Sequence, residues 1–172
     1  MVTKISRRTF LKTGLIGAVA LAAAGGLYRA ARGPAKLEKF VLDGEAGSAL
    51  AAIVAAMLNG AMPAPSVQVI GAEIERVKEA IAGLPLITQN EIQDLFGLLT
   101  LAPARRFLAG IPDQWRDAKP EHVAAFLQSW RTHRIGMLQS AYHALHDLII
   151  GAWYADPENW DAIGYPGPPN LS

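Results

Sequence analysis

The longest helical pattern in the chain reads IGMLQSAYHALHDLIIGAWY and runs from Ile135 to Tyr154. Its apolar residues recur every three or four positions, which predicts the central helix of a bundle. This stripe contains Leu138, Ala141, Tyr142, Leu145, Leu148, Ile149, Ala152 and Trp153. A second stripe beside it contains His143, His146, Ile150 and Tyr154. The second stripe has two explanations: it receives a partner chain, or the helix is surrounded within its own fold.

Four shorter segments upstream repeat the helical spacing, and none shows the alternation that is typical of a strand. Residues that interrupt helices separate them: the Asn59-Gly60 pair, Gly83, Pro85 and Pro120. The third segment opens with Thr88-Gln-Asn-Glu91, a spacing that predicts a capping box. A short helical piece is expected over 104–108. The apolar faces contain Leu50, Ile53, Val54, Met57 and Leu58; Ile70, Ile74, Val77 and Ile81; Ile92, Leu95, Phe96 and Leu99; and Val123, Phe126, Leu127 and Trp130.

The composition is typical of one folded domain. With 172 residues, 51% hydrophobic and 18% charged, the chain is long enough to bury a core. We therefore expect an all-α fold, a small irregular bundle of about five main helices over 43–154, followed by an extended proline-rich C-terminal arm over 155–172. The chain has no cysteine, which excludes disulfides, thiolate metal sites, cysteine-held iron–sulfur clusters and a cysteine nucleophile.

The first 32 residues differ in composition from the rest. The sequence Ser6-Arg7-Arg8-Thr9-Phe10-Leu11-Lys12 precedes the uncharged run 13–28, and the first acidic residue is Glu38. A basic start before a short apolar run predicts an export leader over 1–32, with 33–42 as a linker. The apolar run is shorter than the ~20 residues that span a bilayer comfortably. Ala22-Ala23-Ala24 have the small side chains that a cleavage site for such a leader requires. If the leader is not cleaved, an alternative function is that of a membrane-tethered structural protein.

The leader resembles the twin-arginine (Tat) signal of bacteria, which a translocase reads in order to carry folded proteins across the membrane. The matching residues are Ser6, Arg7, Arg8, Phe10, Leu11 and Lys12. Removing the leader up to Ala24 deletes four cations and lowers the net charge from +1 to −3. A mildly acidic body gives no reason to expect nucleic-acid binding.

The C-terminal end concentrates aromatic residues and prolines. Asp156-Pro157-Glu158 has the N-cap and first-turn proline of a short helix. Aromatic rings give large contact areas, and prolines reduce the cost of ordering, so the arm is expected to bind a partner. The predicted partner-binding residues are Trp153, Tyr154, Trp160, Tyr165, Pro166, Gly167, Pro168 and Pro169, together with Tyr142 and His146. The alternative is that the arm packs back on its own bundle.

The residues His143, His146 and Asp147 lie within one turn of the longest helix, which favours a metal-binding helical protein as a second hypothesis. No third, distant ligand is identifiable, so the main interpretation of these residues is structural and the expected metal site is none. For Arg105, Arg106, Arg131 and Arg134 the default interpretation is solvated surface charge, and the alternative is that they pair with carboxylates within the fold or on another chain. No phosphate loop, nucleotide fingerprint, nucleophile elbow or metalloprotease helix is found, so no catalytic residue is predicted.

The leader, the cysteine-free helical body and the ending GAWYADPENWDAIGYPGPP together resemble one family. This is the small (gamma) subunit of membrane-associated FAD-dependent sugar and alcohol dehydrogenases, which accompanies sorbitol, fructose, glucose and gluconate dehydrogenases. The resemblance is specific at 6–12 and 153–169. It implies a non-catalytic subunit that binds no cofactor and that folds with a large flavoprotein of the glucose-methanol-choline type, in which FAD is bound.

The resemblance also implies a location and further partners. The large subunit of that family lacks its own signal and is exported by the Tat translocase together with the small subunit, and a multihaem cytochrome c often completes the complex. We therefore expect a periplasmic protein, associated with the membrane through the complex or through an uncleaved leader.

Overall fold

The computed structural model describes residues 39–42, 44–62, 66–161 and 164–167. Within these ranges the protein is all-helical and has no strand, as predicted. The helices are α2 (Gly44–Met57), α3 (Val67–Ala82), α4 (Leu86–Thr100), α5 (Ala102–Phe107), α6 (Pro120–Arg131) and α7 (Gly136–Ala155), with short 3-10 turns η1 (Trp115–Asp117) and η2 (Pro157–Asn159). The five long helices and the short α5 correspond to the six predicted segments. The leader residues 6–12 lie outside the described residues.

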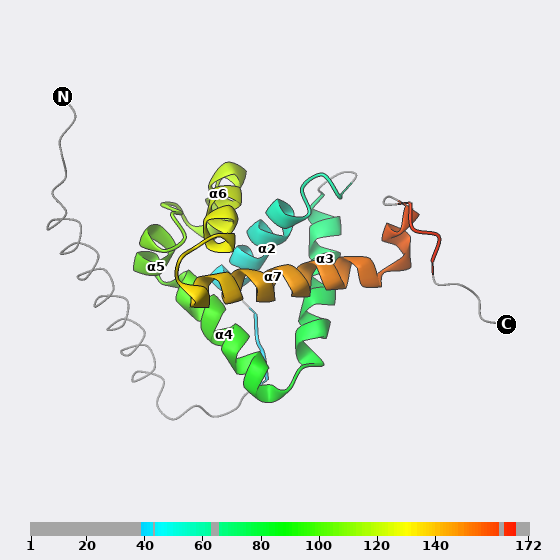
Figure 1. Ribbon diagram of the computed structural model, residues 1–172, viewed down its shortest axis with the longest axis horizontal. Helices are drawn as coiled ribbons and strands as arrows, with labels where there is room; N and C mark the ends of the chain where they lie inside the picture. Colours follow the sequence, from blue (N-terminus) through cyan, green and yellow to red (C-terminus); the bar gives the residue numbers. More distant parts are fainter. Residues whose placement is uncertain (1–38, 43, 63–65, 162–163, 168–172) are drawn as a thin grey trace, which may run out of the picture. The chain divides into compact units, whose positions relative to one another are not determined.

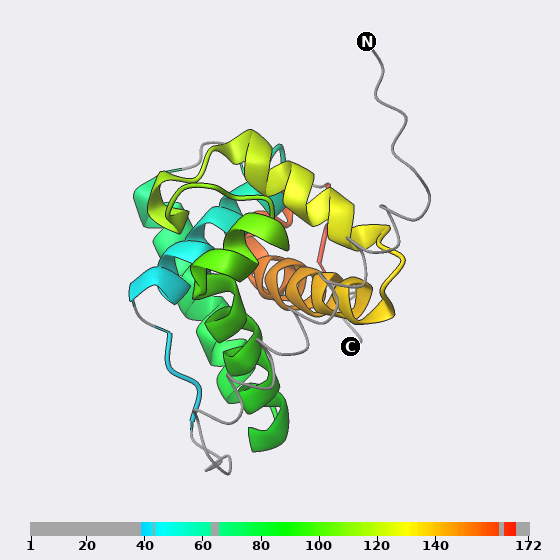
Figure 2. The same ribbon diagram turned by 90° about the vertical axis from the view of Figure 1, so that its left-hand side faces the viewer.

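Helix α2 is the central helix of this bundle. It contacts α3, α4, α6, α7 and η1, and Figure 2 shows it between the pair α3 and α4 on one side and the pair α6 and α7 on the other. Its sequence GEAGSALAAIVAAM is rich in alanine and glycine, so neighbouring helices approach it closely. The prediction that Ile135 to Tyr154 forms the central helix was therefore wrong.

Helix α7 has a buried face and an exposed face. In Figure 1 it runs from α6 across α3, the two helices with which it makes most of its contacts. Its predicted apolar stripe lies in the core or against it, whereas His143, Ala144 and Asp147 are exposed. Of the two explanations for the second stripe, the fully surrounded helix is contradicted, because one side of α7 faces solvent.

A single hydrophobic core joins the helices. Three of its aromatic side chains are in contact, because Phe126 meets Trp115 and Trp130 edge-on, with ring centroids 5.9 Å and 4.7 Å apart. Both indoles donate to backbone carbonyls, Trp115 Nε1 to Leu99 at 2.9 Å and Trp130 Nε1 to Leu108 at 3.1 Å. Buried indole N–H groups therefore tie α4, α5, α6 and η1 together.

An ion pair reinforces the same region. The carboxylate of Glu45, in the first turn of α2, accepts from Arg105 Nη1 at 3.1 Å and from the backbone N–H of Trp115 at 2.9 Å. Arg105 is buried, so this cation has its partner within the fold. Its neighbour Arg106 is exposed and donates to the carbonyl of Pro112 at 3.3 Å.

The start of α4 differs from the predicted capping box. The helix begins at Leu86 with Pro85 at the N-cap, and no side chain caps it. The backbone N–H of Thr88 donates to the carbonyl of Pro85 at 2.9 Å, so Thr88 lies inside the first turn and the capping-box prediction was wrong. Pro85 has φ −55°, a value close to that of a helical residue, which lets the helix begin three residues earlier.

The buried Gln89 joins α4 to two other segments. Its Nε2 donates to the carbonyls of Ala82 and Leu84, at 3.1 and 2.8 Å, and its Oε1 accepts from the backbone N–H of Phe40 at 3.2 Å. One turn later, Gln93 Oε1 accepts from the N–H of Val41 at 2.9 Å. The described part of the predicted linker, 39–42, is therefore docked along α4.

We expect Gln89→Ala to lower the free energy of unfolding by about 1–3 kcal/mol, because buried backbone groups lose their partners. Amide hydrogen exchange at Phe40 should accelerate at the same time, since its N–H loses its acceptor. Chemical denaturation and exchange measured by mass spectrometry check both effects. The exposed Gln68→Ala on α3 is the matched control; equal, small effects of the two substitutions would contradict this role of Gln89.

None of the helices in the described residues is both long enough and apolar enough to span a membrane.

Candidate partner-binding surface

The chain folds back on itself after α7. Asp156 caps η2 by accepting the backbone N–H of Glu158 at 3.0 Å, as predicted from Asp156-Pro157-Glu158. Asn159 Nδ2 then donates to the carbonyl of Trp153 at 2.8 Å, and Trp160 Nε1 donates to the carbonyl of Tyr154 at 2.8 Å. Both acceptors belong to the last turn of α7, where backbone carbonyls have no hydrogen-bond partner within the helix. We call residues 156–161 and 164–167 the C-terminal hook.

An aromatic pair forms the centre of the hook. The rings of Trp160 and Tyr165 meet edge-on with centroids 5.2 Å apart, and the backbone N–H of Tyr165 donates to the carbonyl of Trp160 at 3.0 Å. Gly167 lies against the Trp160 ring with φ +89°, and a Cβ there would lie 3.1 Å from Cζ3. Only glycine fits this position without strain, so the close approach of Gly167 helps hold the Trp160 ring in place.

The predicted partner-binding residues fall into three groups. Tyr154 and Tyr165 are exposed, by 38% and 44%, and Pro166 is exposed beside them. Trp160, Gly167, Tyr142 and His146 are partly buried. Trp153 is only 2% exposed and belongs to the core. Pro168 and Pro169 lie outside the described residues.

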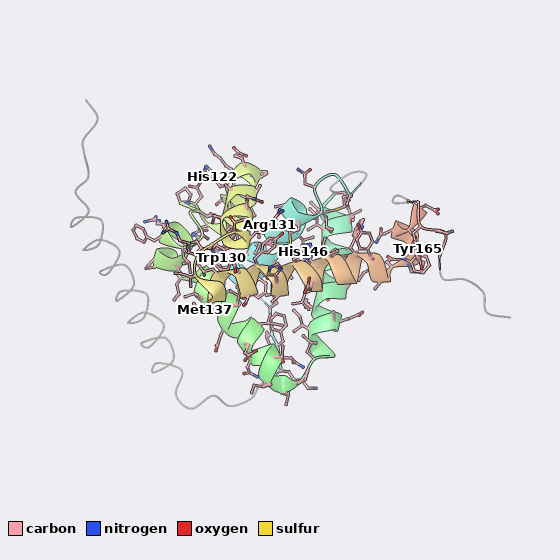
Figure 3. The ribbon with its side chains drawn as sticks, in the orientation of Figure 1. His122, Trp130, Arg131, Met137, His146 and Tyr165 are labelled. Carbon is pink, nitrogen blue, oxygen red and sulfur yellow. The ribbon has the colours of Figure 1, made fainter. Side chains whose placement is uncertain are left out.

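Two features of the predicted arm need correction. Trp153 cannot contact a partner directly, because its indole is packed among the core residues of the bundle. The described part of the arm is also not extended, since Trp160 donates to the carbonyl of Tyr154 and accepts from the backbone N–H of Tyr165. The remaining surface is smaller than predicted. It consists of the exposed residues Tyr154 and Tyr165 near the C-terminal end of α7, where the Tyr165 ring contacts Trp160 (Figure 3, where Tyr165 is labelled).

Three charged residues fix the hook to α3. Arg76 donates from Nη2 to Asp156 and from Nη1 to Glu73, the latter at 3.3 Å. Glu73 has no exposed surface, and its Oε1 has no hydrogen-bond partner among the described residues. Sequence reasoning missed this cluster. The available signal was a single carboxylate on the apolar face of α3, between Ile70 and Val77, with a cation three residues later.

The buried carboxyl of Glu73 makes stability depend on pH. Burial raises its pKa above the ordinary value of 4.5, and the hydrogen bond and charge of Arg76 oppose that rise. Between pH 4.5 and the raised pKa, the folded state keeps a proton on Glu73 that the unfolded state has released. The stabilisation from this group is therefore complete below pH 4.5 and is lost as the pH rises through the folded pKa.

We therefore expect Glu73→Gln to raise stability at neutral pH and to flatten its decline above the unfolded pKa. Urea denaturation over a pH series measures the effect. Glu75→Gln is the control, because the Glu75 side chain is 66% exposed and forms a surface ion pair with Lys78. An unchanged pH dependence in Glu73→Gln would show that this carboxyl is not the source.

The histidines of α7 form a small polar cluster. His146 Nδ1 lies 3.1 Å from Asp147 Oδ1, and the Tyr142 ring contacts His143 and His146 at centroid distances of 5.4 and 5.8 Å. Over the part of the chain that is described, no three His, Cys, Asp or Glu side chains lie close enough together to hold a metal ion. The predicted metal alternative therefore gains no third ligand within these ranges.

In comparisons with known proteins, no family model, curated protein or solved structure matches this chain.

Proposed function

We infer that this chain is the non-catalytic small subunit of a periplasmic FAD-dependent dehydrogenase complex for a sugar or alcohol. In this proposal it binds a large flavoprotein of the glucose-methanol-choline type, stabilises it, and carries it across the membrane through the Tat translocase. The flavin and the chemistry belong to the large subunit. A cytochrome c completes the complex, and the complex or an uncleaved leader holds it at the membrane.

The observation that carries the proposal is the pairing of two features at opposite ends of the chain. One is the motif Ser6-Arg7-Arg8-Thr9-Phe10-Leu11-Lys12, a signal for a route that exports folded proteins. The other is the C-terminal hook, whose hydrogen bonds hold aromatic side chains in place before any partner arrives. A rigid aromatic surface binds with little further loss of side-chain entropy, which suits a subunit whose task is to hold another protein.

Exposed Tyr rings are typical of protein interfaces rather than of a self-contained surface. Tyrosine is enriched at binding hot spots because it combines a large apolar contact with one polar atom. Tyr154 and Tyr165 supply two such rings, and the ion pair of Arg76 with Asp156 fixes the start of the hook to α3.

Co-purification tests the proposal. The affinity-tagged chain is isolated from the cells that naturally produce it, and the absorption spectrum of the purified material is recorded. We expect a flavin spectrum and a large second polypeptide in a fixed ratio to the tagged chain. A colourless preparation that contains the tagged chain alone would refute the proposal.

A further inference from the structure

Charge is segregated along α7 and the segments that flank it. Between residues 122 and 146 the only fully ionised side chains are Arg131 and Arg134, and there is no carboxylate. From 147 to 172 the order is reversed, because this stretch contains Asp147, Asp156, Glu158 and Asp161 and neither lysine nor arginine. The helix dipole adds about half a positive charge at the start of α7 and half a negative charge at its end, so it reinforces the segregation.

The positive end also exposes apolar side chains. Phe107, Met137 and Ile135 are 89%, 70% and 48% exposed. The hydrogen bond from Trp130 Nε1 to the carbonyl of Leu108 places the end of α5 beside the end of α6, so Phe107 and Arg131 flank the same contact. We call Phe107, Arg131, Arg134, Ile135 and Met137 the basic corner; Figure 3 labels Arg131 and Met137 within it.

The arginines of the corner are not neutralised within the described residues. Arg131 and Arg134 are exposed, and neither takes part in the ion pairs of this part of the chain. Arginine, methionine and phenylalanine are enriched in protein interfaces, and lysine is depleted there. The corner therefore fits a protein surface that carries carboxylates next to apolar or aromatic groups.

The C-terminal hook is a surface of that kind on the same chain. Glu158 and Asp161 are exposed there, next to the exposed rings of Tyr154 and Tyr165. The hook and the corner stand at opposite ends of α7, about 30 Å apart for a helix of this length, and one copy therefore cannot bring them together. Two copies can.

We propose that the basic corner of one copy binds the C-terminal hook of a second copy, so that the protein self-associates head to tail. Two antiparallel copies can make this contact twice, in a two-fold symmetric dimer, whereas a contact made only once per pair of copies extends into a ring or an open chain. Because the hook is also the surface assigned to the partner subunit, a bound partner displaces the second copy. The inference does not require that partner to be a flavoprotein.

Sedimentation velocity of the full-length chain at several concentrations tests the proposal with two charge reversals. One variant carries Arg131→Glu and Arg134→Glu, and the other carries Glu158→Arg and Asp161→Arg. At about 0.01 M ionic strength the wild type should form faster-sedimenting species, and these should disappear at about 1 M, where the screening length is ~3 Å. Each variant alone should lose them, because both of its ends then have the same sign of charge.

An equimolar mixture of the two variants should regain association, because each then offers the surface that the other needs. Reversing two exposed carboxylates elsewhere, Glu91→Arg with Glu121→Arg, should leave association unchanged. A wild type that stays monomeric, association that survives both reversals, or a mixture that stays dissociated would each overturn the proposal. Binding of a monomeric wild type, but not of the corner variant, to phosphatidylglycerol vesicles would instead assign the corner to anionic lipid.

Discussion

Replacing Trp115 by alanine is expected to lower the free energy of unfolding by about 3–5 kcal/mol, the usual cost of removing a large buried aromatic side chain. Trp115 is 1% exposed and contacts Phe126 edge-on at 5.9 Å. Its indole N–H donates to the carbonyl of Leu99 at 2.9 Å, and that carbonyl loses its partner in the variant. A domain of this size has roughly 5–15 kcal/mol of stability in all, so the loss should be visible as partial unfolding.

Trp115→Phe separates the two contributions. Phenylalanine keeps most of the ring contact with Phe126 but cannot donate to Leu99, so we expect the smaller loss of about 1–3 kcal/mol that an unpaired buried acceptor costs. The control is Val67→Ala, because Val67 is 86% exposed at the start of α3. Denaturation followed by circular dichroism measures all three. Equal stabilities for Trp115→Ala and the control would contradict the assigned role of this side chain.

Replacing Arg7 and Arg8 by lysine is expected to keep this chain in the cytoplasm, because the motif that the translocase reads is lost while the charge is kept. If the chain escorts a large subunit, the flavoprotein should remain in the cytoplasm with it, although its own sequence is unaltered. Cell fractionation followed by immunoblotting of both proteins gives the result.

Two comparisons make the export experiment specific. Lys4→Arg changes a cation outside the motif and should leave both proteins in the periplasm. In the arginine-pair variant, a flavoprotein that still reaches the periplasm at its normal level would show that its export does not depend on this chain. If only this chain is lost from the periplasm, the result would support the export function of the leader but not the escort role of the chain.

The helices could be read from the sequence because apolar spacing and the Gly and Pro positions both reflect local geometry. The first-turn proline of α6, Pro120, is a case in which the residue type itself restricts the backbone, and α3 ends at Gly83, where the sequence predicted a stop. The identity of the central helix could not be read in this way. Helix α2 is central because its alanines permit close approach on several sides, a property that the apolar stripe of a longer helix conceals.

The candidate site was predictable only in part, because burial of a side chain depends on what packs over it. Tyr154 and Tyr165 were predicted as surface and are exposed, whereas their neighbour Trp153 lies on the α7 face that packs into the core. The helical spacing predicted Trp153 as a core residue, whereas the aromatic composition of the C-terminal end predicted it as part of the arm. The prediction from helical spacing agrees with its burial. The hydrogen bond of Gln89 to Phe40 and the ion pair of Arg76 with Asp156 join segments far apart in the chain, and no local pattern encodes such contacts.

Retention of flavin by the purified chain tests the central claim, that the C-terminal hook holds a flavoprotein. Tagged wild type, the double variant Tyr154→Ala with Tyr165→Ala, and the control Val67→Ala are each isolated from the cells that naturally produce the chain, and flavin bound per chain is measured. The loss of one hot-spot ring costs about 2 kcal/mol, or roughly 30-fold in affinity. The wild type and the control should therefore retain flavin while the hook variant loses it, with its helical content unchanged. Equal flavin in all three preparations, or none in any of them, would contradict the claim.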